Sequence, residues 1–202
     1  MNVLVACEES QTVTKAFRAK GHEAFSCDII SCSGGHPEWH LQQDVTELLQ
    51  QDWDLLIAHP PCTYLSVVQN IWFKEKYRER FPNRPQQRED AVEFFNLFVN
   101  APIPKKAIEN PIGIMSTRYR KADQIISPHY FGDRLSKRTC LWLTNLSPLI
   151  YDKSKINPNP VPFQIWELEI RSKDAAFGGE LGKRARSKTS DFIANAMAEQ
   201  WG

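Results

Sequence analysis

Cys62 ends an apolar run that closes on two prolines, in the stretch DLLIAHPPC at residues 54–62. A thiolate held in a rigid turn is a good nucleophile toward electron-poor carbon. The bland alternative is a buried cysteine that acts as a small apolar residue. Glu109 and Asn110 end a second predicted strand, KKAIEN. A carboxyl group there can hold or transfer a proton. Cys62 and Glu109 are therefore the predicted catalytic residues.

Short apolar segments alternate with helical ones along the chain, which predicts an α/β fold with a mostly parallel sheet and helices on both faces. In such sheets ligands bind beyond the carboxyl ends of the strands. We expect the strands at residues 3–6, 22–29, 53–59, 105–110 and 138–146. We expect the helices at 10–21, 64–77, 86–100 and 187–201, a short helical turn at 44–51, and irregular chain at 31–43 and 147–161. Ser10 is the expected N-cap of the first helix.

Composition indicates one globular domain, because 202 residues with 42% hydrophobic and 24% charged residues suit a single core. Five cysteines without framework spacing predict reduced thiols in the cytoplasm. Residues 1–60 carry three Lys/Arg against nine Asp/Glu, whereas residues 118–138 and 171–188 each carry six Lys/Arg against two acids. The asymmetry is compatible with a phosphate-binding second half or with a chance split of surface charge.

Taken in chain order, these segments resemble the motifs of the cytosine carbon-5 (C5) DNA methyltransferases. DLLIAHPPC resembles the nucleophile motif, Glu109-Asn-Pro resembles the Glu-Asn-Val motif, SKRTCLWL resembles the later arginine motif, and the last helix resembles the closing segment. The resemblance implies a Rossmann-like methyltransferase fold that uses S-adenosylmethionine. Residues 1–202 would form one methyltransferase domain, with a cofactor side (1–60), a catalytic half (61–144), a reduced recognition region (145–187) and a closing helix (188–202).

The resemblance implies a role for each catalytic candidate. Cys62 would add to carbon 6 of cytosine and make carbon 5 nucleophilic. Glu109 would protonate or hydrogen-bond ring nitrogen 3, although it could instead cap the segment that follows. Arg138 would hold the base and stabilise charge, with Arg134 and Lys137 as nearby basic residues.

The resemblance also predicts the cofactor site, at Cys7, Glu8, Asp28, Asp44 and Pro60. Asp28 would bind the ribose hydroxyls. Asp44 would lie near the adenine amino group, or would cap the next helical turn, or both. The family's first motif is a Phe-x-Gly-x-Gly loop, whereas ACEESQTVTKAF contains no glycine, so non-glycine residues must shape the backbone there.

DNA is the expected partner, with the base flipped out of the duplex. The predicted phosphate-binding residues are Arg134, Lys137, Lys183, Arg184 and Arg186. Three alternatives stay open: a methyltransferase of the free nucleotide dCMP, an exocyclic-amino methyltransferase, because HPPC also resembles the Asn/Asp-Pro-Pro-aromatic turn of that class, and a non-catalytic nucleic-acid-binding relic.

A second cluster could bind metal, because Cys27, Cys32, His36 and His40 are all residue types that ligate zinc. Their spacing is unusual, however, and we predict a loop beside the cofactor or the substrate rather than a metal site.

Overall fold

A computed structural model describes residues 1–174 and 186–202 of the chain, without the side chains of 171–174. Its centre is a seven-stranded sheet in the order β3-β2-β1-β4-β5-β8-β6. The strands are β1 Asn2–Ala6, β2 Glu23–Asp28, β3 His40–Gln42, β4 Leu55–Ala58, β5 Lys105–Pro111, β6 Gln124–Ile126 and β8 Thr139–Thr144, and a separate pair is formed by β7 Leu135–Ser136 and β9 Val161–Pro162.

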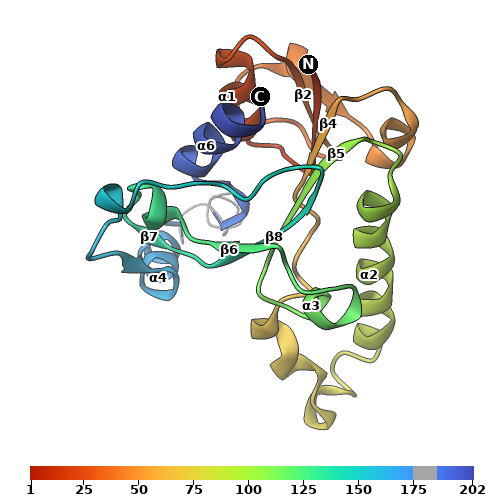
Figure 1. The fold of residues 1–202 in the computed structure, drawn as a ribbon. Helices are drawn as coiled ribbons and strands as arrows, with labels where there is room; N and C mark the ends of the chain where they lie inside the picture. Colours follow the sequence, from red (N-terminus) through yellow and green to blue (C-terminus); the bar gives the residue numbers. More distant parts are fainter. Residues whose placement is uncertain (175–185) are drawn as a thin grey trace.

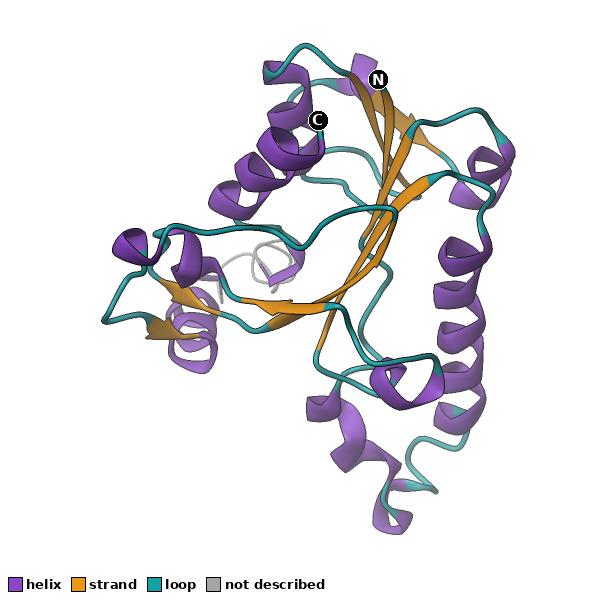
Figure 2. Ribbon diagram, viewed as in Figure 1, coloured by secondary structure: helices purple, strands orange, loops and turns teal. Residues whose placement is uncertain are grey.

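Helices cover both faces of this sheet (Figures 1 and 2). The α-helices are α1 Thr12–Ala19, α2 Arg84–Asn100, α3 Met115–Arg118, α4 Phe163–Asp174 and α6 Asp191–Trp201. Short 3-10 turns are η1 Pro37–Trp39, η2 Val45–Gln50, η3 Val67–Phe73, η4 Glu75–Tyr77, η5 Pro128–Phe131 and η6 Lys153–Lys155. Among the described residues, no helix is both long and apolar enough to cross a membrane.

Alternating residues of the central strands supply two separate cores. Val3 and Ile57 face α1 and α6 and pack with Phe17 and Met197. On the opposite face the strands pack against η2 and α2, where Phe95 is fully buried. Strands buried on both faces read as unbroken apolar runs, which is why residues 3–6 and 55–58 could be predicted.

The order of the strands reverses at β1. The chain passes from β1 outward to β2 and β3, and it then returns to β4 and β5 on the other side of β1. These five strands are parallel, whereas β8 runs antiparallel to both β5 and β6. The α/β, Rossmann-like fold with a mostly parallel sheet is thereby confirmed. The carboxyl ends of β1 and β4 mark the switch point, and such sheets bind ligands beyond the strand ends at that point.

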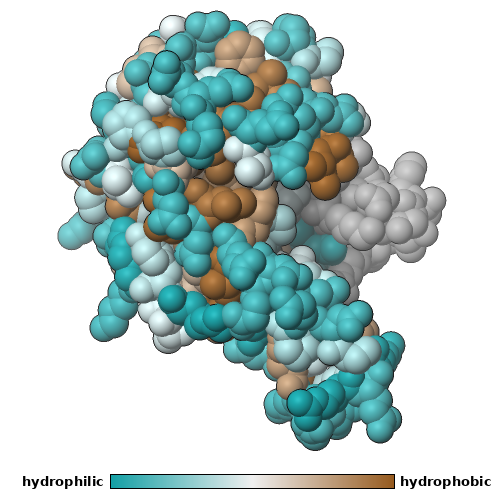
Figure 3. Space-filling view, turned by 90° about the vertical axis from the view of Figure 1, so that its right-hand side faces the viewer, coloured by the Kyte–Doolittle hydropathy of each residue, from teal (hydrophilic) through white to brown (hydrophobic). Residues whose placement is uncertain are grey.

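Two secondary-structure predictions were wrong. The helix expected at residues 64–77 consists of the turns η3 and η4, because Val67, Val68 and Ile71 are exposed and offer no apolar face to pack. This segment projects from the lower end of the molecule, and its surface is largely hydrophilic (Figures 1 and 3). The loop expected at residues 31–43 contains the short edge strand β3, paired with β2.

Candidate active site

The carboxyl ends of β4 and β5 lie side by side, since Ala58 pairs with Ile108 in the parallel ladder. One buried hydrogen bond joins the turn after β4 to the end of β5: Asn110 Nδ2 donates to the Pro60 carbonyl over 2.6 Å. Asn110 is only 1% exposed, so water does not compete for this bond. The bond fastens the double-proline turn, and with it Cys62, to the end of β5 beside Glu109.

Cys62 lies at the start of a tight turn, where its carbonyl accepts hydrogen bonds from the amides of Leu65 and Ser66, both over 3.1 Å. Burial raises the pKa of its thiol, and the negative charge of Glu109 raises it further, whereas the positive charge of Lys137 lowers it. The structure therefore brings Cys62, Glu109 and Lys137 within electrostatic range of one another. The raised pKa keeps the Cys62 thiol protonated at neutral pH.

Two donors hold the Glu109 carboxylate, one from each neighbouring strand. Thr139 Oγ1, on β8, donates to Glu109 Oε1. His59 Nδ1, directly after β4, lies 3.2 Å from Glu109 Oε2. The Glu109 and His59 side chains are 19% and 8% exposed. Glu109 is thus largely enclosed and held in one orientation.

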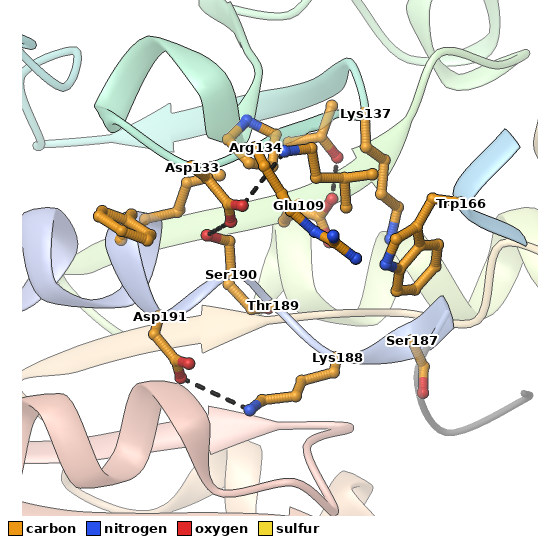
Figure 4. A pocket seen from close by; sticks show the side chains of 15 residues that line it. Glu109, Asp133, Arg134, Lys137, Trp166, Ser187, Lys188, Thr189, Ser190 and Asp191 are labelled. Carbon is orange, nitrogen blue, oxygen red and sulfur yellow. Dashed lines mark hydrogen bonds and ion pairs between the residues drawn. The ribbon is translucent and has the colours of Figure 1, made fainter. Parts of the chain in front are cut away.

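A cavity of about 290 Å³ opens beside Glu109 (Figure 4). Its lining comes from β5, from the chain around β7 and β8, from α4 and from the start of α6, and it includes Lys137, Thr139 and Trp166. Lys137 and Thr139 share one side of their segment because side chains alternate along an extended chain. Arg138 lies between them, is exposed, and does not belong to the lining. Lys137, rather than Arg138, is thus the cation beside Glu109.

The predicted phosphate-binding residues are only partly gathered at this cavity. Arg134 is exposed on its lining and lies 3.9 Å from Glu169. Lys137 Nζ donates to the Arg186 carbonyl over 2.7 Å. The Arg186 guanidinium lies 3.6 Å from Glu167. Lys183 and Arg184 lie outside the described residues.

The loop after β1 takes a glycine-like path without glycine. Cys7 and Gln11 have φ values of 59° and 57°, in the left-handed region that glycine enters most easily. The Gln11 side chain holds this path through two bonds to the backbone of His36, with Nε2 donating to the carbonyl over 2.7 Å and Oε1 accepting from the amide over 3.0 Å. Hydrogen bonds of the Gln11 side chain thus stabilise a left-handed backbone path that glycine adopts without such support.

Glu8 caps helix α1, which corrects the predicted N-cap at Ser10. The N-cap residue is Gln11, and its side chain makes no capping bond. Glu8 accepts instead from the Val13 amide over 2.6 Å and from the amide and hydroxyl of Thr14 over 3.2 and 2.7 Å. Both carboxylate oxygens of Glu8 are therefore engaged in holding the helix, although Glu8 also lines a small cavity.

Glu9, which is not one of the predicted site residues, has a buried side-chain oxygen without a hydrogen-bond partner among the described residues. Its Oε2 has no hydrogen bond to any described residue. Glu9 lines a cavity of about 120 Å³ together with Cys7, Asp28 and His59. An unpaired buried carboxylate oxygen is costly in the free protein. It is therefore a candidate partner for a positively charged group of a ligand.

A third cavity, of about 250 Å³, adjoins this one, since Cys7 and Asp28 line both. Asp28 stands at the end of β2, and burial raises the pKa of its carboxyl. Asp44 lines the third cavity and also caps η2, since its Oδ1 accepts from the Thr46 amide over 2.8 Å. Pro61 lines this cavity, whereas the Pro60 carbonyl is taken by Asn110. Burial, reinforced by the charge of Asp28, raises the pKa of the Cys7 thiol, so that Cys7 stays neutral.

The cysteine and histidine cluster does not gather around one point. In the part of the chain that the structure describes, no three His, Cys, Asp or Glu residues are placed to hold a metal. Cys27 Sγ donates to the Gln43 carbonyl over 3.4 Å. His40 bonds Ser26 Oγ and the Ile30 carbonyl. His36 stacks on Trp39, with 3.7 Å between the ring centroids.

Comparison with known proteins identifies no family. No family model matches the chain, and no curated protein matches it. One similar solved structure is an Escherichia coli protein described as a "putative DNA modification methyltransferase encoded within prophage", with 15% identity and a TM-score of 0.44 over 71% of this chain. The chain spans 46% of that protein. At this identity and score the likeness does not indicate function.

Proposed function

We propose that this protein is an S-adenosylmethionine-dependent methyltransferase that modifies cytosine at carbon 5, in DNA. One observation carries the proposal. The Asn110–Pro60 bond fastens the double-proline turn to the end of β5, so that a thiol and a largely enclosed carboxyl group share one edge of the sheet. An open cavity lies beside that carboxyl group. This pairing suits attack on an aromatic ring that must be protonated as it is attacked.

Cys62 and Glu109 act in concert in this mechanism. Cys62 gives its thiol proton to Glu109, and the thiolate forms a bond to carbon 6 of cytosine. Glu109 passes the proton to ring nitrogen 3, so that the ring becomes an enamine with a nucleophilic carbon 5. In the free protein the charge of Glu109 raises the pKa of Cys62 and keeps the thiol protonated. Once Glu109 carries a proton, that opposing charge is gone and Lys137 remains to stabilise the thiolate. Protonation of the acid therefore favours formation of the nucleophile.

The residues around the two smaller cavities fit the expected cofactor. Asp28 stands at a strand end, where an acid can bind ribose hydroxyls. The unpaired Glu9 oxygen suits the ammonium group of the methionine part. S-adenosylmethionine, when bound, supplies an electrophilic methyl group for carbon 5. Afterwards water accepts the proton of carbon 5, ring nitrogen 3 returns its proton to Glu109, and the bond from Cys62 Sγ to carbon 6 breaks with its electron pair left on sulfur.

DNA is the proposed substrate because three basic residues, Arg134, Lys137 and Lys188, line the main cavity. The lining also holds the acids Glu109, Asp133 and Asp191, and Lys188 Nζ lies 3.6 Å from Asp191. Cations at the mouth of a base-sized pocket can bind the phosphates on either side of a flipped nucleotide.

The test is covalent trapping with 5-fluorocytosine, since fluorine cannot leave carbon 5 as a proton does. The protein is incubated with S-adenosylmethionine and 5-fluorocytosine in duplex DNA, in single-stranded DNA or as the nucleotide, and is then denatured and weighed by mass spectrometry. We expect an adduct with duplex DNA that Cys62→Ser abolishes and the matched control Cys32→Ser retains. The analogue without fluorine should yield 5-methylcytosine. N4-methylcytosine without an adduct would overturn the proposal. An adduct that forms with the nucleotide alone would show that the nucleotide, and not DNA, is the substrate.

A further inference from the structure

We propose that His59 is a positioning residue that orients the Glu109 carboxyl group toward the substrate base. The role rests on the proposed function of Glu109. No motif considered in the sequence analysis assigns a task to His59, which directly precedes the double proline.

The position of His59 is well determined by the backbone. Its amide donates to the Ala6 carbonyl over 3.0 Å, which extends the β1–β4 ladder by one bond beyond Ala58. Pro60, which follows, has a fixed φ and a carbonyl bonded to Asn110. The imidazole is 8% exposed. A ring held this firmly has little freedom to leave Glu109.

The hydrogen bond between His59 and Glu109 has a defined direction. A carboxylate only accepts hydrogen bonds, so Nδ1 carries the proton and donates to Oε2 over 3.2 Å. His59 Nε2 is buried and has no partner among the described residues. His59 also interacts with Glu8, on the loop after β1, and lowers the pKa of that carboxyl group, which burial raises. Glu9 and Asp28 line the small cavity together with His59 and Glu8, so that His59 lies among four acidic residues, Glu109 included.

His59 and Thr139 restrain Glu109 from opposite sides of β5. His59 extends from β4 to Oε2, and Thr139 extends from β8 to Oε1. Together they occupy two of the roughly four lone-pair positions of a carboxylate, which leaves positions free for a proton. A general acid must be within hydrogen-bond reach of its target. The two donors allow Glu109 to present its proton without rotating away.

Two substitutions at His59 separate the hydrogen bond from the bulk of the ring. His59→Asn keeps a donor close to the place of Nδ1, whereas His59→Phe keeps the ring and removes the donor. We expect His59→Phe to slow single-turnover adduct formation with 5-fluorocytosine duplex by about 10- to 100-fold, the range for a lost hydrogen bond to a charged group. His59→Asn should recover most of the rate. If His59→Phe does not fold, His59→Gln replaces it, because its donor lies near the place of Nε2 and does not reach Glu109.

A double-mutant cycle then tests whether His59 acts through Glu109. In a Glu109→Gln background, His59→Phe should change the adduct rate by less than about twofold, because there is no acid left to orient. An equal loss in both backgrounds, or failure of His59→Asn to recover the rate, would overturn the positioning role. If the wild type forms the adduct and His59→Phe forms it equally fast, the positioning role is overturned and the proposed function is not. Absence of a wild-type adduct would overturn the proposed function and this role with it.

Discussion

Removing the charge of Glu109 should make Cys62 more reactive toward small reagents, although it should slow the proposed reaction. Burial and the negative charge of Glu109 both raise the pKa of Cys62. Glu109→Gln removes the charge and keeps the size of the side chain, and its amide oxygen can still accept from one of the two donors. The thiolate fraction at pH 7.5 should therefore rise.

The size of the effect follows from where the two groups lie. Glu109 is 19% exposed, so solvent screens part of its charge. Loss of one partly screened unit charge should increase the thiolate fraction by about 3- to 10-fold. Burial is the larger cause of the raised pKa, and the substitution does not relieve it. The pKa of Cys62 should fall but should stay above that of an exposed thiol.

The assay is alkylation by iodoacetamide at pH 7.5, with each cysteine followed separately by peptide mass spectrometry. Cys62 should react about 3- to 10-fold faster in Glu109→Gln and more slowly in Lys137→Met, which removes the charge that favours the thiolate. Cys32 is the internal reference, and its rate should not change. Unchanged or slower alkylation of Cys62 in Glu109→Gln would refute the electrostatic reasoning. The same variant should form the 5-fluorocytosine adduct about 10²- to 10⁴-fold more slowly, because the general acid is lost.

Four further substitutions test the framework of the site. Asn110→Ala should destabilise the protein by about 1–3 kcal/mol, because it leaves the buried Pro60 carbonyl unsatisfied, and thermal unfolding should show a loss of about 2–4 °C per kcal/mol. Glu8→Ala should cost about 1–3 kcal/mol by the same measurement, because the cap of α1 is lost, whereas the neighbouring Glu9→Ala should be neutral or stabilising and should weaken cofactor binding. Asp28→Ala should weaken S-adenosylmethionine binding by about 1–3 kcal/mol in calorimetry, and an unchanged affinity would contradict its role at the ribose.

The strand ends that form the site could be predicted because Cys62 follows the apolar run at residues 55–58, and Glu109 follows the short apolar pair Ala107 and Ile108. That pattern placed Cys62 and Glu109 at the carboxyl ends of two strands, and the parallel pairing of β4 with β5 makes those ends neighbours. The pairing itself could not be predicted, because strand order depends on contacts distant in sequence. The Asn110–Pro60 bond, which spans 50 residues, has no local signal for the same reason.

The sequence does not indicate whether Lys137 or Arg138 faces the cavity. Both are basic and both precede β8, so composition does not separate them. A one-residue shift in register exchanges the two faces of a strand. Register here is set by the pairing of Glu109 with Leu141, and it places Thr139 and Lys137 toward the cavity. Thr139 had no signal in the sequence, since a threonine at a strand start is common.

The loop after β1 shows why a missing glycine motif is weak evidence against a ligand site. Left-handed conformations at Cys7 and Gln11 cost about 1–2 kcal/mol each relative to glycine. Three hydrogen bonds to Glu8 and two between Gln11 and His36 hold the same segment. At about 0.5–1.5 kcal/mol each, and more for bonds to a charged carboxylate, these bonds are large enough to offset the strain. Glycine makes such a path accessible, whereas here the side chains of Glu8 and Gln11 impose it. A loop held by its own side chains is also rigid before any ligand binds, which lowers the entropic cost of binding.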